Sequence, residues 1–299
     1  MKLATYSTAT TEPRAAIVDG TQVFDIASAS GGALPSVLLE VMARPHWKRE
    51  LDDLIAANPA PSHDLADVSL HAPIERPGKL LAAAGNYQAH VDEGGGDRVD
   101  TTRRTPRIFL KPSSSIIAAG AALSLPTVSH EVDWEIELAI VIGRTARNVS
   151  VTDALDVVGG YAVINDVSAR SMSWGIEDRE VHEWDRFFDW LTGKWIDGFA
   201  PLGPWIVTAD DIADPDALDL SLQVNGEIWQ QATTADMIFS CAELVAFCSR
   251  ICTLEPGDII ATGTPAGCGV ASGRFLTDGD VMVGTVAGLG ELRTPVVGP

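Results

Sequence analysis

Residues 133–143, Asp-Trp-Glu-Ile-Glu-Leu-Ala-Ile-Val-Ile-Gly, constrain the fold more than any other segment of this sequence. Acidic and apolar residues alternate over the first six positions, and the segment is then apolar up to Gly143. The alternation predicts a β-strand with Asp133, Glu135 and Glu137 on one face, because side chains two residues apart point the same way. The apolar continuation predicts a strand that enters a buried core. Either the acidic face is a solvated edge, or its carboxylates lie beside a cation, a shared proton or a basic partner.

The buried alternative predicts a metal site. A cluster of carboxylate oxygens suits hard divalent ions, Mg²⁺ or Mn²⁺ foremost, with Ca²⁺ as a further candidate. Asp166 is the best candidate for a third ligand because it ends an apolar segment, where an acid is costly without a purpose. Arg170 follows four residues later and has the geometry to bind a carboxylate bidentately. The alternative is an ordinary strand-ending aspartate paired with Arg170.

The distribution of elements predicts a mixed α/β fold that is mainly β, in two parts. Residues 1–75 combine short strand-like and helix-like pieces and are followed by prolines, which predicts a small N-terminal α+β domain and a main domain over residues 76–299. Within the main domain, Asn225-Gly226 lies between alternating segments and predicts a hairpin with a type I′ turn. Strands are predicted over 79–87, 107–112, 135–143 and 161–167, and helices over 153–160 and 241–252.

Charge and hydropathy exclude two classes of partner. The 299 residues include 41 acidic and 21 basic side chains, a formal net charge of -20, which argues against binding to nucleic acid or to an anionic membrane surface. No apolar run approaches the roughly 18 residues of a membrane span. We expect a cytoplasmic protein whose four cysteines, Cys241, Cys248, Cys252 and Cys268, are reduced thiols.

Eight motifs of the main domain resemble, in order, those of the fumarylacetoacetate hydrolase family. They cover about residues 78–295, and residues 1–75 resemble the N-terminal domain of longer members. The resemblance implies the family's β-sandwich roll and a homodimer. The motifs are GNYQAHVDE (85–93), IFLKPSSS (108–115), DWEIELAIVIG (133–143), GGYAVINDVSAR (159–170), GKWIDGFAPLGPW (193–205), VNGEIWQ (224–230), LEPGDIIATGTPAGCG (254–269) and FLTDGD (275–280).

The resemblance implies one Mg²⁺ or Mn²⁺ ion held by Glu135, Glu137 and Asp166, with Asp133 left as an outer or surface acid. The ion would act as a Lewis acid on the 2-oxo and carboxylate oxygens of a 2-oxo acid substrate. Asn86 stands where the longer eukaryotic hydrolases have a further aspartate ligand. Three protein carboxylates would then leave room for water and substrate.

The resemblance also implies the catalytic and substrate-binding residues. His90 and Glu93, three residues apart, lie on one side of a helical turn, where Glu93 orients the imidazole and His90 takes a proton from water. Lys194 would stabilise a developing enolate. Arg170 and Thr264 are expected to contact substrate, and Lys111 fits either substrate binding or a structural role.

Hydrolysis of a carbon–carbon bond in a 1,3-dicarbonyl 2-oxo acid, such as an acylpyruvate or fumarylpyruvate, is the function that the resemblance favours. Oxaloacetate decarboxylation and the hydration or isomerisation of 2-oxo-dienoates are alternatives within the family. A metal-binding protein without catalytic activity is the alternative outside it.

Two further segments have open interpretations. The glycine-rich, charged residues 94–106 resemble the lid that family members close over substrate. The aromatic residues of 173–192 fit either a pocket for an apolar substituent or a dimer interface or core. Ser171 and Ser173 depart from the family pattern, which places a substrate-contacting glutamine after the metal aspartate.

Overall fold

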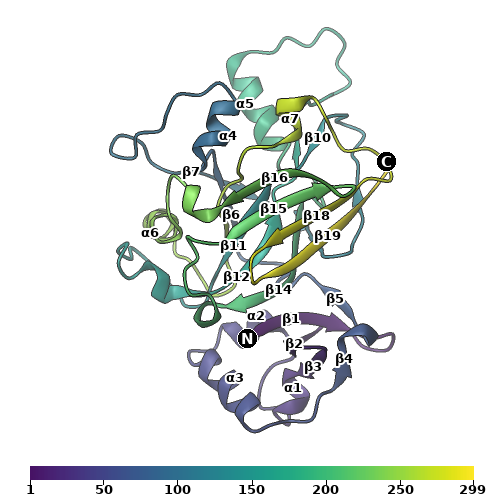
Figure 1. Cartoon of the computed structure of the whole chain (residues 1–299), viewed down its shortest axis with the longest axis vertical. Coiled ribbons are helices and arrows are strands. Elements are labelled where there is room, and N and C mark those ends of the chain that lie inside the picture. The colour runs from purple at the N-terminus through teal and green to yellow at the C-terminus, as the bar shows by residue number, and fades with distance from the viewer.

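The computed structural model describes all 299 residues and confirms the expected mixed α/β fold, in which strands predominate. Two sheets pack face to face in the main body, and the first part of the chain forms a smaller lobe below it (Figure 1). The strands of the large sheet have the order β4-β3-β2-β1-β14-β12-β11-β17-β6-β7, with β5 paired to β1 and β8 paired to β14. The facing sheet has the order β16-β15-β18-β19-β9.

The bounds of the large sheet follow chain order. They are β1 Lys2–Ser7, β2 Arg14–Asp19, β3 Gln22–Asp25, β4 His63–Asp64, β5 Ser69–His71, β6 Leu80–Ala84, β7 Arg107–Lys111, β8 Ile116–Ala118, β11 Ile136–Ile142, β12 Val158–Asn165, β14 Ala200–Thr208 and β17 Ile259–Ala261. The facing sheet contains β9 Leu123–Ser124, β15 Asp219–Val224, β16 Glu227–Thr233, β18 Val281–Val286 and β19 Gly290–Val297. A separate pair joins β10 Val132–Asp133 to β13 Ser168–Ala169.

The helices lie around the sheets and at their ends. They are α1 Ile26–Ala29, α2 Leu38–Met42, α3 Trp47–Ala56, α4 Gln88–Glu93, α5 Glu183–Thr192, α6 Cys241–Ile251 and α7 Gly269–Ser272. Short 3₁₀ turns occupy Leu65–Asp67, Ser113–Ser115, Ala154–Val157, Ala209–Asp211 and Thr234–Asp236. No helix has both the length and the apolar character that crossing a membrane requires.

β11 lies at the centre of the large sheet and is wholly buried, as the sequence predicted. It pairs with β12 on one side and β17 on the other. The side chains of Ile136 and Leu138 point into the core between the two sheets, where they meet apolar residues of β15 and β18. Glu135 and Glu137 alternate with them and therefore occupy the opposite face of the strand.

The N-terminal lobe shares the large sheet with the main body. β1 pairs with β14 as well as with β2, so the sheet continues from one part into the other. Helix α3 buries Trp47 and Leu51, and Trp47 Nε1 donates a hydrogen bond of 3.1 Å to the carbonyl of Gly143. The lobe is therefore joined to the main body by backbone and side-chain hydrogen bonds.

Two local predictions within the main domain are confirmed, and one is wrong. The hairpin between β15 and β16 turns at Asn225 and Gly226, with φ of 55° and 83°, and α6 forms where a helix was predicted. The helix predicted over 153–160 is wrong, because only Ala154–Val157 forms a 3₁₀ turn and β12 begins at Val158. Gly160 explains the difference: a Cβ there would lie 2.4 Å from the Val207 carbonyl oxygen, so this residue fits a close approach between strands.

Candidate metal centre and active site

Three carboxylates meet where β11 begins and β12 ends. Glu135 directly precedes β11, Glu137 is its second residue, and Asp166 directly follows β12. The pairing of Ile136 with Asn165 aligns the strands, and the Asp166 amide donates 2.8 Å to the Glu135 carbonyl. One carboxylate oxygen from each acid lies within 4.8 Å of the others, and all three side chains are buried. The structure therefore places the three predicted ligands together.

Glu137 is the carboxylate with the fewest protein partners. Its Oε2 accepts a hydrogen bond of 2.7 Å from the Gly263 amide, and its Oε1 is buried without any partner. Gly263 has φ of 96°, and a Cβ there would lie 2.7 Å from the Asn86 Cβ, so glycine is required at this approach. A buried acceptor without a donor is costly, which makes Oε1 an available ligand atom.

Two buried lysines lie among the carboxylates. Lys194 Nζ donates to Glu135 Oε2 at 2.8 Å and to Asp166 Oδ2 at 2.7 Å. Lys111 Nζ donates to the other oxygen of Asp166 at 2.5 Å and to the Val167 carbonyl at 3.1 Å. Both ammonium groups thus offset the charge that the acids bring into the core.

Asp133 lies beside the cluster and has a structural role. The sequence left it as an outer or surface acid, but it is wholly buried. Its carboxylate accepts from the amides of Gly269 and Val270 at 2.6 and 3.0 Å and from Arg170 Nε at 2.8 Å. Arg170 Nη2 also donates 2.6 Å to Glu135 Oε1. Arg170 therefore fixes two protein carboxylates, and its contact with substrate stays a prediction.

The electrostatics of the cluster divide the carboxylates. Burial, together with the charges of Asp166 and Glu135, raises the pKa of Glu137 well above its usual value. Burial also favours the neutral form of Glu135, but Lys194 and Arg170 outweigh it and hold the pKa of Glu135 well below its usual value. Burial lowers the pKa of Lys111 despite its contact with Asp166. The site thus holds more negative charge than its bases comfortably offset.

These residues fit a divalent cation. The donor set is three carboxylates, which suits Mg²⁺ or Mn²⁺, and one buried oxygen of Glu137 has no other partner. Added positive charge would relieve the repulsion that raises the pKa of Glu137. The protein thus has a candidate metal site at Glu135, Glu137 and Asp166.

Helix α4 brings the predicted histidine and glutamate to this cluster. A ring nitrogen of His90 lies within 4.8 Å of a Glu135 oxygen. His90 Nδ1 is 3.5 Å from Glu93 Oε2, while Glu93 Oε1 accepts 2.9 Å from the Gly267 amide. Both side chains are partly exposed, at 21% and 27%, so water reaches them. The pair therefore stands between solvent and the carboxylates.

Thr264 and Asn86 are held by protein groups. Thr264 Oγ1 donates 2.9 Å to the Ile136 carbonyl and accepts 2.8 Å from Gln230 Nε2. Gln230 Oε1 in turn accepts 2.9 Å from the Ile136 amide. Asn86 bonds to the backbone of Phe239 through both its amide oxygen and nitrogen, and its nitrogen also donates to Thr262. Asn86 thus braces the site and has no oxygen directed at the metal cluster.

Sequence reasoning missed Gln230 and Cys268. Gln230 lies in an ordinary strand pattern, and nothing in that pattern distinguishes it from its exposed neighbour Gln231. Cys268 was expected to be a reduced thiol, but its Sγ lies 3.7 Å from His90 Nδ1. A cysteine next to the TGTPAG motif was the available signal.

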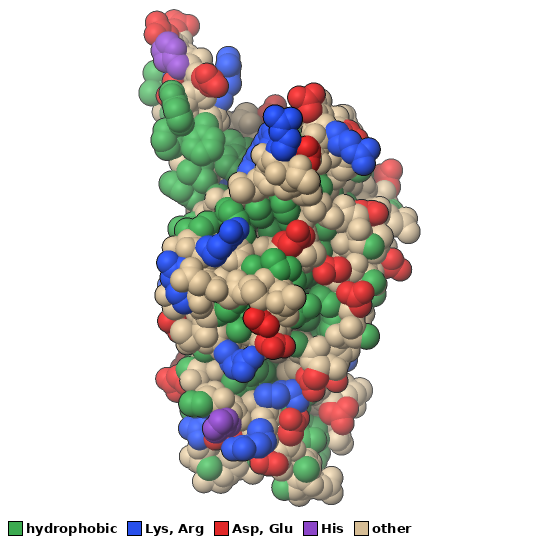
Figure 2. Space-filling model, turned by 90° about the vertical axis from the view of Figure 1, so that its left-hand side faces the viewer, with side chains coloured by type: hydrophobic (Ala, Val, Ile, Leu, Met, Phe, Trp, Pro, Cys, Tyr) green, Lys and Arg blue, Asp and Glu red, His purple; other side chains and the backbone are tan.

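The aromatic segment divides between the site and the surface. Trp190 stacks edge-on against Phe109 at 5.1 Å, and Lys194 Nζ lies 5.4 Å from the Phe109 ring and 6.0 Å from the Trp190 ring. By contrast, Trp184 and Phe188 of α5 are 72% and 54% exposed. Hydrophobic side chains gather on the protrusion seen at the top of Figure 2. Residues 94–106 form no helix or strand, and their role as a lid stays a prediction.

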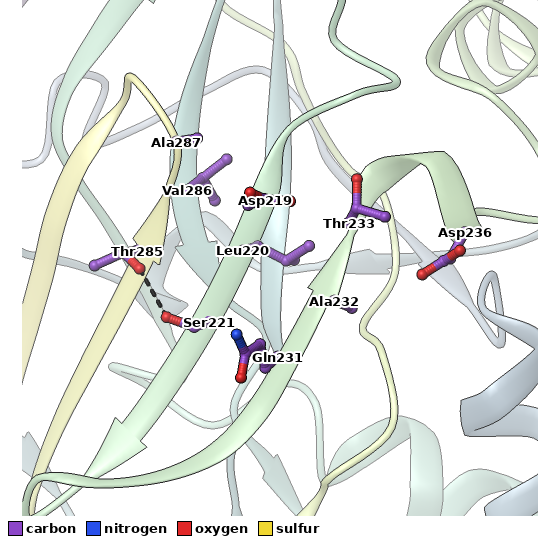
Figure 3. A pocket seen from close by; sticks show the side chains of 10 residues that line it. All are labelled: Asp219, Leu220, Ser221, Gln231, Ala232, Thr233, Asp236, Thr285, Val286 and Ala287. Atoms are coloured by element: carbon purple, nitrogen blue, oxygen red, sulfur yellow. Dashed lines mark hydrogen bonds between the residues drawn. The ribbon is translucent and has the colours of Figure 1, made fainter.

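A separate hollow of about 480 Å³ lies over β15, β16 and β18 (Figure 3). It is lined by ordinary strand side chains, among them Ser221 and Thr285, whose hydroxyls are 2.9 Å apart. It contains neither a histidine nor a basic side chain. The carboxylate cluster with His90 is therefore the better candidate for catalysis.

Comparison with known proteins agrees with this geometry. Residues 79–297 match the model of the fumarylacetoacetate (FAA) hydrolase C-terminal family. The mitochondrial oxaloacetate tautomerase Fahd2a of Rattus norvegicus is 38% identical over 267 residues, 89% of this chain and 81% of that protein. The maleylpyruvate hydrolase of Aquipseudomonas alcaligenes is 37% identical over 298 residues, 95% of this chain and 96% of that protein.

A solved structure is similar over the whole chain. It is maleylpyruvate hydrolase from Sphingobium sp. SYK-6 in complex with manganese(II) and pyruvate, with a TM-score of 0.79 and 33% identity, covering 100% of this chain and 99% of that one. These relatives are enzymes, and the matched residues include every member of the carboxylate cluster. The chain belongs to the fumarylacetoacetate hydrolase family.

Proposed function

We propose that this protein is a metal-dependent hydrolase that cleaves the carbon–carbon bond of an acylpyruvate, a 1,3-dicarbonyl 2-oxo acid. The observation that carries the proposal is the position of His90, whose ring nitrogen lies within 4.8 Å of the Glu135 carboxylate while Glu93 is 3.5 Å from its Nδ1. A hydrolase needs a base beside the metal site, and this pair supplies one. Similarity to maleylpyruvate hydrolases over nearly the whole chain supports the same class.

Glu135, Glu137 and Asp166 would hold Mg²⁺ or Mn²⁺, which when bound supplies Lewis-acid polarisation of the substrate's 2-oxo and carboxylate oxygens. His90 takes a proton from water, and Glu93 stabilises the resulting imidazolium. The hydroxide attacks the distal carbonyl carbon, and the tetrahedral intermediate breaks its bond to the methylene carbon. The products are a carboxylic acid and the enolate of pyruvate, which Lys194 stabilises and which a proton then converts to pyruvate.

The test is product analysis with acylpyruvates of increasing tail size, maleylpyruvate and fumarylpyruvate included, in the presence of Mn²⁺. We expect one pyruvate and one carboxylic acid per substrate, no turnover with excess chelator, and none with the Glu137→Gln variant. Mn²⁺ binding without pyruvate release from any acylpyruvate would reject the hydrolase.

Oxaloacetate tautomerisation is a second candidate, favoured by the 38% identity to the rat enzyme. It needs proton transfer between carbon and oxygen but no attacking water, so His90 would serve as acid and base without bond cleavage. Rapid interconversion of enol and keto oxaloacetate, with no pyruvate or carbon dioxide formed, would favour this reaction. Carbon dioxide release would instead indicate decarboxylation.

We also propose that the enzyme is a cytoplasmic homodimer. The exposed aromatic rings of Trp184, Phe187 and Phe188 on α5 support an apolar interface, because such clusters mark interaction surfaces. The four unpaired cysteines support a reducing compartment. Light scattering would show a dimer for the wild type, and the Trp184→Ala/Phe188→Ser variant would shift it toward monomer. A monomeric wild type would reject the dimer.

A further inference from the structure

A second group of metal-ligand side chains lies beside the carboxylate cluster and shares one residue with it. It consists of His90, Glu135 and Cys268, whose ligand atoms all lie within 4.8 Å of one another. Cys268 is buried and His90 is 21% exposed, so the group opens to solvent on the histidine side. Nitrogen, sulfur and one carboxylate are the ligands of Zn²⁺ and not those that Mg²⁺ or Mn²⁺ prefers.

The spacing of the two softer ligands is that of atoms bound to one ion. Tetrahedral zinc with Zn–S of about 2.3 Å and Zn–N of about 2.1 Å separates sulfur from nitrogen by about 3.6 Å. Cys268 Sγ lies 3.7 Å from His90 Nδ1. The other neighbours of the sulfur are weak, namely Gln230 Nε2 at 3.7 Å and the Pro265 carbonyl at 3.9 Å. Little rearrangement is needed for both atoms to face one cation.

We propose that His90, Cys268 and Glu135 form an inhibitory site for a soft divalent cation, of which Zn²⁺ is the best fit. On binding, the thiol releases its proton to solvent as the sulfur–zinc bond forms, and the imidazole binds through the lone pair of Nδ1. Nδ1 then no longer faces Glu93, and Glu135 is drawn from the carboxylate cluster. Zinc at this site therefore removes the base and one ligand of the catalytic cation together.

The first experiment measures binding without turnover. Co²⁺, a spectroscopic substitute for Zn²⁺, is added to the full-length protein in saturating Mg²⁺, and the thiolate-to-cobalt charge-transfer absorption is recorded. We expect one equivalent to produce the band, Zn²⁺ to abolish it, and the Cys268→Ala and Cys268→Ser variants to lack it. The matched control is Cys252→Ala, which removes another partly exposed thiol and should keep the band. Mn²⁺ binding by each variant verifies its fold.

The second experiment rests on the proposed function and measures zinc inhibition of acylpyruvate cleavage, each variant relative to its own rate without zinc. We expect the half-inhibiting Zn²⁺ concentration to rise by more than about tenfold in Cys268→Ala, since even the loss of a ligand's hydrogen-bond partner weakens metal affinity about 10- to 100-fold. No cobalt band in the wild type, a band retained without Cys268, or equal zinc inhibition with and without it would overturn the site. Absence of hydrolysis would affect only this second experiment.

Discussion

The ammonium group of Lys194 donates a hydrogen bond of 2.7 Å to Asp166, and both side chains are almost wholly buried. Lys194 also reaches Glu135, so a single cation holds two of the three candidate metal ligands in place. This contact means that the carboxylates are positioned before any metal arrives. It also means that Lys194 has a structural role distinct from the enolate stabilisation proposed for it.

Replacement of Lys194 should therefore destabilise the metal-free protein. We expect Lys194→Met to lower the free energy of unfolding by about 3–5 kcal/mol, because removing one partner of a buried ion pair leaves uncompensated charge. Saturating Mn²⁺ should recover part of the loss by returning positive charge to the carboxylates. Urea unfolding with and without Mn²⁺ measures both effects.

The matched control for this experiment is Lys48→Met. Lys48 also pairs with two aspartates, Asp52 and Asp210, but these are 51% and 57% exposed. Its loss should cost less than about 1 kcal/mol, as for other surface pairs. Equal losses for the two variants would contradict the structural role of Lys194.

Metal binding should stabilise the wild type and not the Glu137→Gln variant. A ligand that binds only the folded state adds about 2.7 kcal/mol at 100 times its dissociation constant. Glu137 is the best ligand to remove because one of its oxygens has no protein partner. Thermal unfolding against Mn²⁺ concentration tests this, with the exposed Glu227→Gln as control. An unchanged shift in Glu137→Gln would place the ion elsewhere.

The carboxylate cluster was predictable because its signal is local. Alternation followed by an apolar run placed Glu135 and Glu137 on one face of a buried strand, and the structure confirms that arrangement. Asp166 was found for the same reason, as an acid at the end of an apolar strand. Each inference required only the two-residue period of a strand and the cost of burying charge.

The surroundings of the cluster were not predictable, because they depend on contacts between distant segments. Asp133 was expected to be an outer or surface acid, yet it is buried by amides 136 and 137 positions later in the chain. Cys268 meets His90 across 178 positions. No periodicity within one element records such pairings, since the fold of the loops after β17 brings them about.

His90 and Glu93 should separate by the size of their effects. We expect His90→Ala to lower kcat by about 10²–10⁴-fold, the usual contribution of a general base, with Mn²⁺ binding retained. Glu93→Gln should cost less, because it keeps an acceptor for the Gly267 amide and loses only the charge beside the imidazole. Steady-state kinetics with metal titrations distinguish these roles. Full activity in His90→Ala would exclude a base at this position.

Trp190 should influence the choice of substrate tail. It is the α5 aromatic that packs against Phe109 and lies 6.0 Å from the ammonium group of Lys194. We expect Trp190→Ala to raise KM for acylpyruvates with bulky apolar tails more than for those with short ones. Trp184→Ala, which alters a 72% exposed ring, is the control. A uniform change in KM across tails would show that Trp190 does not line the tail site.

Asp25 in the N-terminal lobe should make stability depend on acid pH. It is buried and accepts hydrogen bonds from Arg14, Tyr6 and the Ser28 amide. Burial alone would raise the pKa of Asp25, but the bonds from Arg14 and Ser28 outweigh it and hold the pKa well below the usual value. A depressed folded-state pKa stabilises the fold above the unfolded pKa of about 3.9, and this contribution disappears as pH falls below it.

The variant Asp25→Asn removes this contribution. We expect it to lower the free energy of unfolding by about 1.5–3 kcal/mol at pH 7, the range for hydrogen bonds to charged groups. The difference from the wild type should shrink steadily below about pH 4, where the wild-type unfolded state takes up a proton that the folded carboxylate resists. Denaturant unfolding at a series of pH values measures it. A difference that stays constant down to pH 2 would show that the charge of Asp25 does not contribute, and that only its shape and hydrogen bonds do.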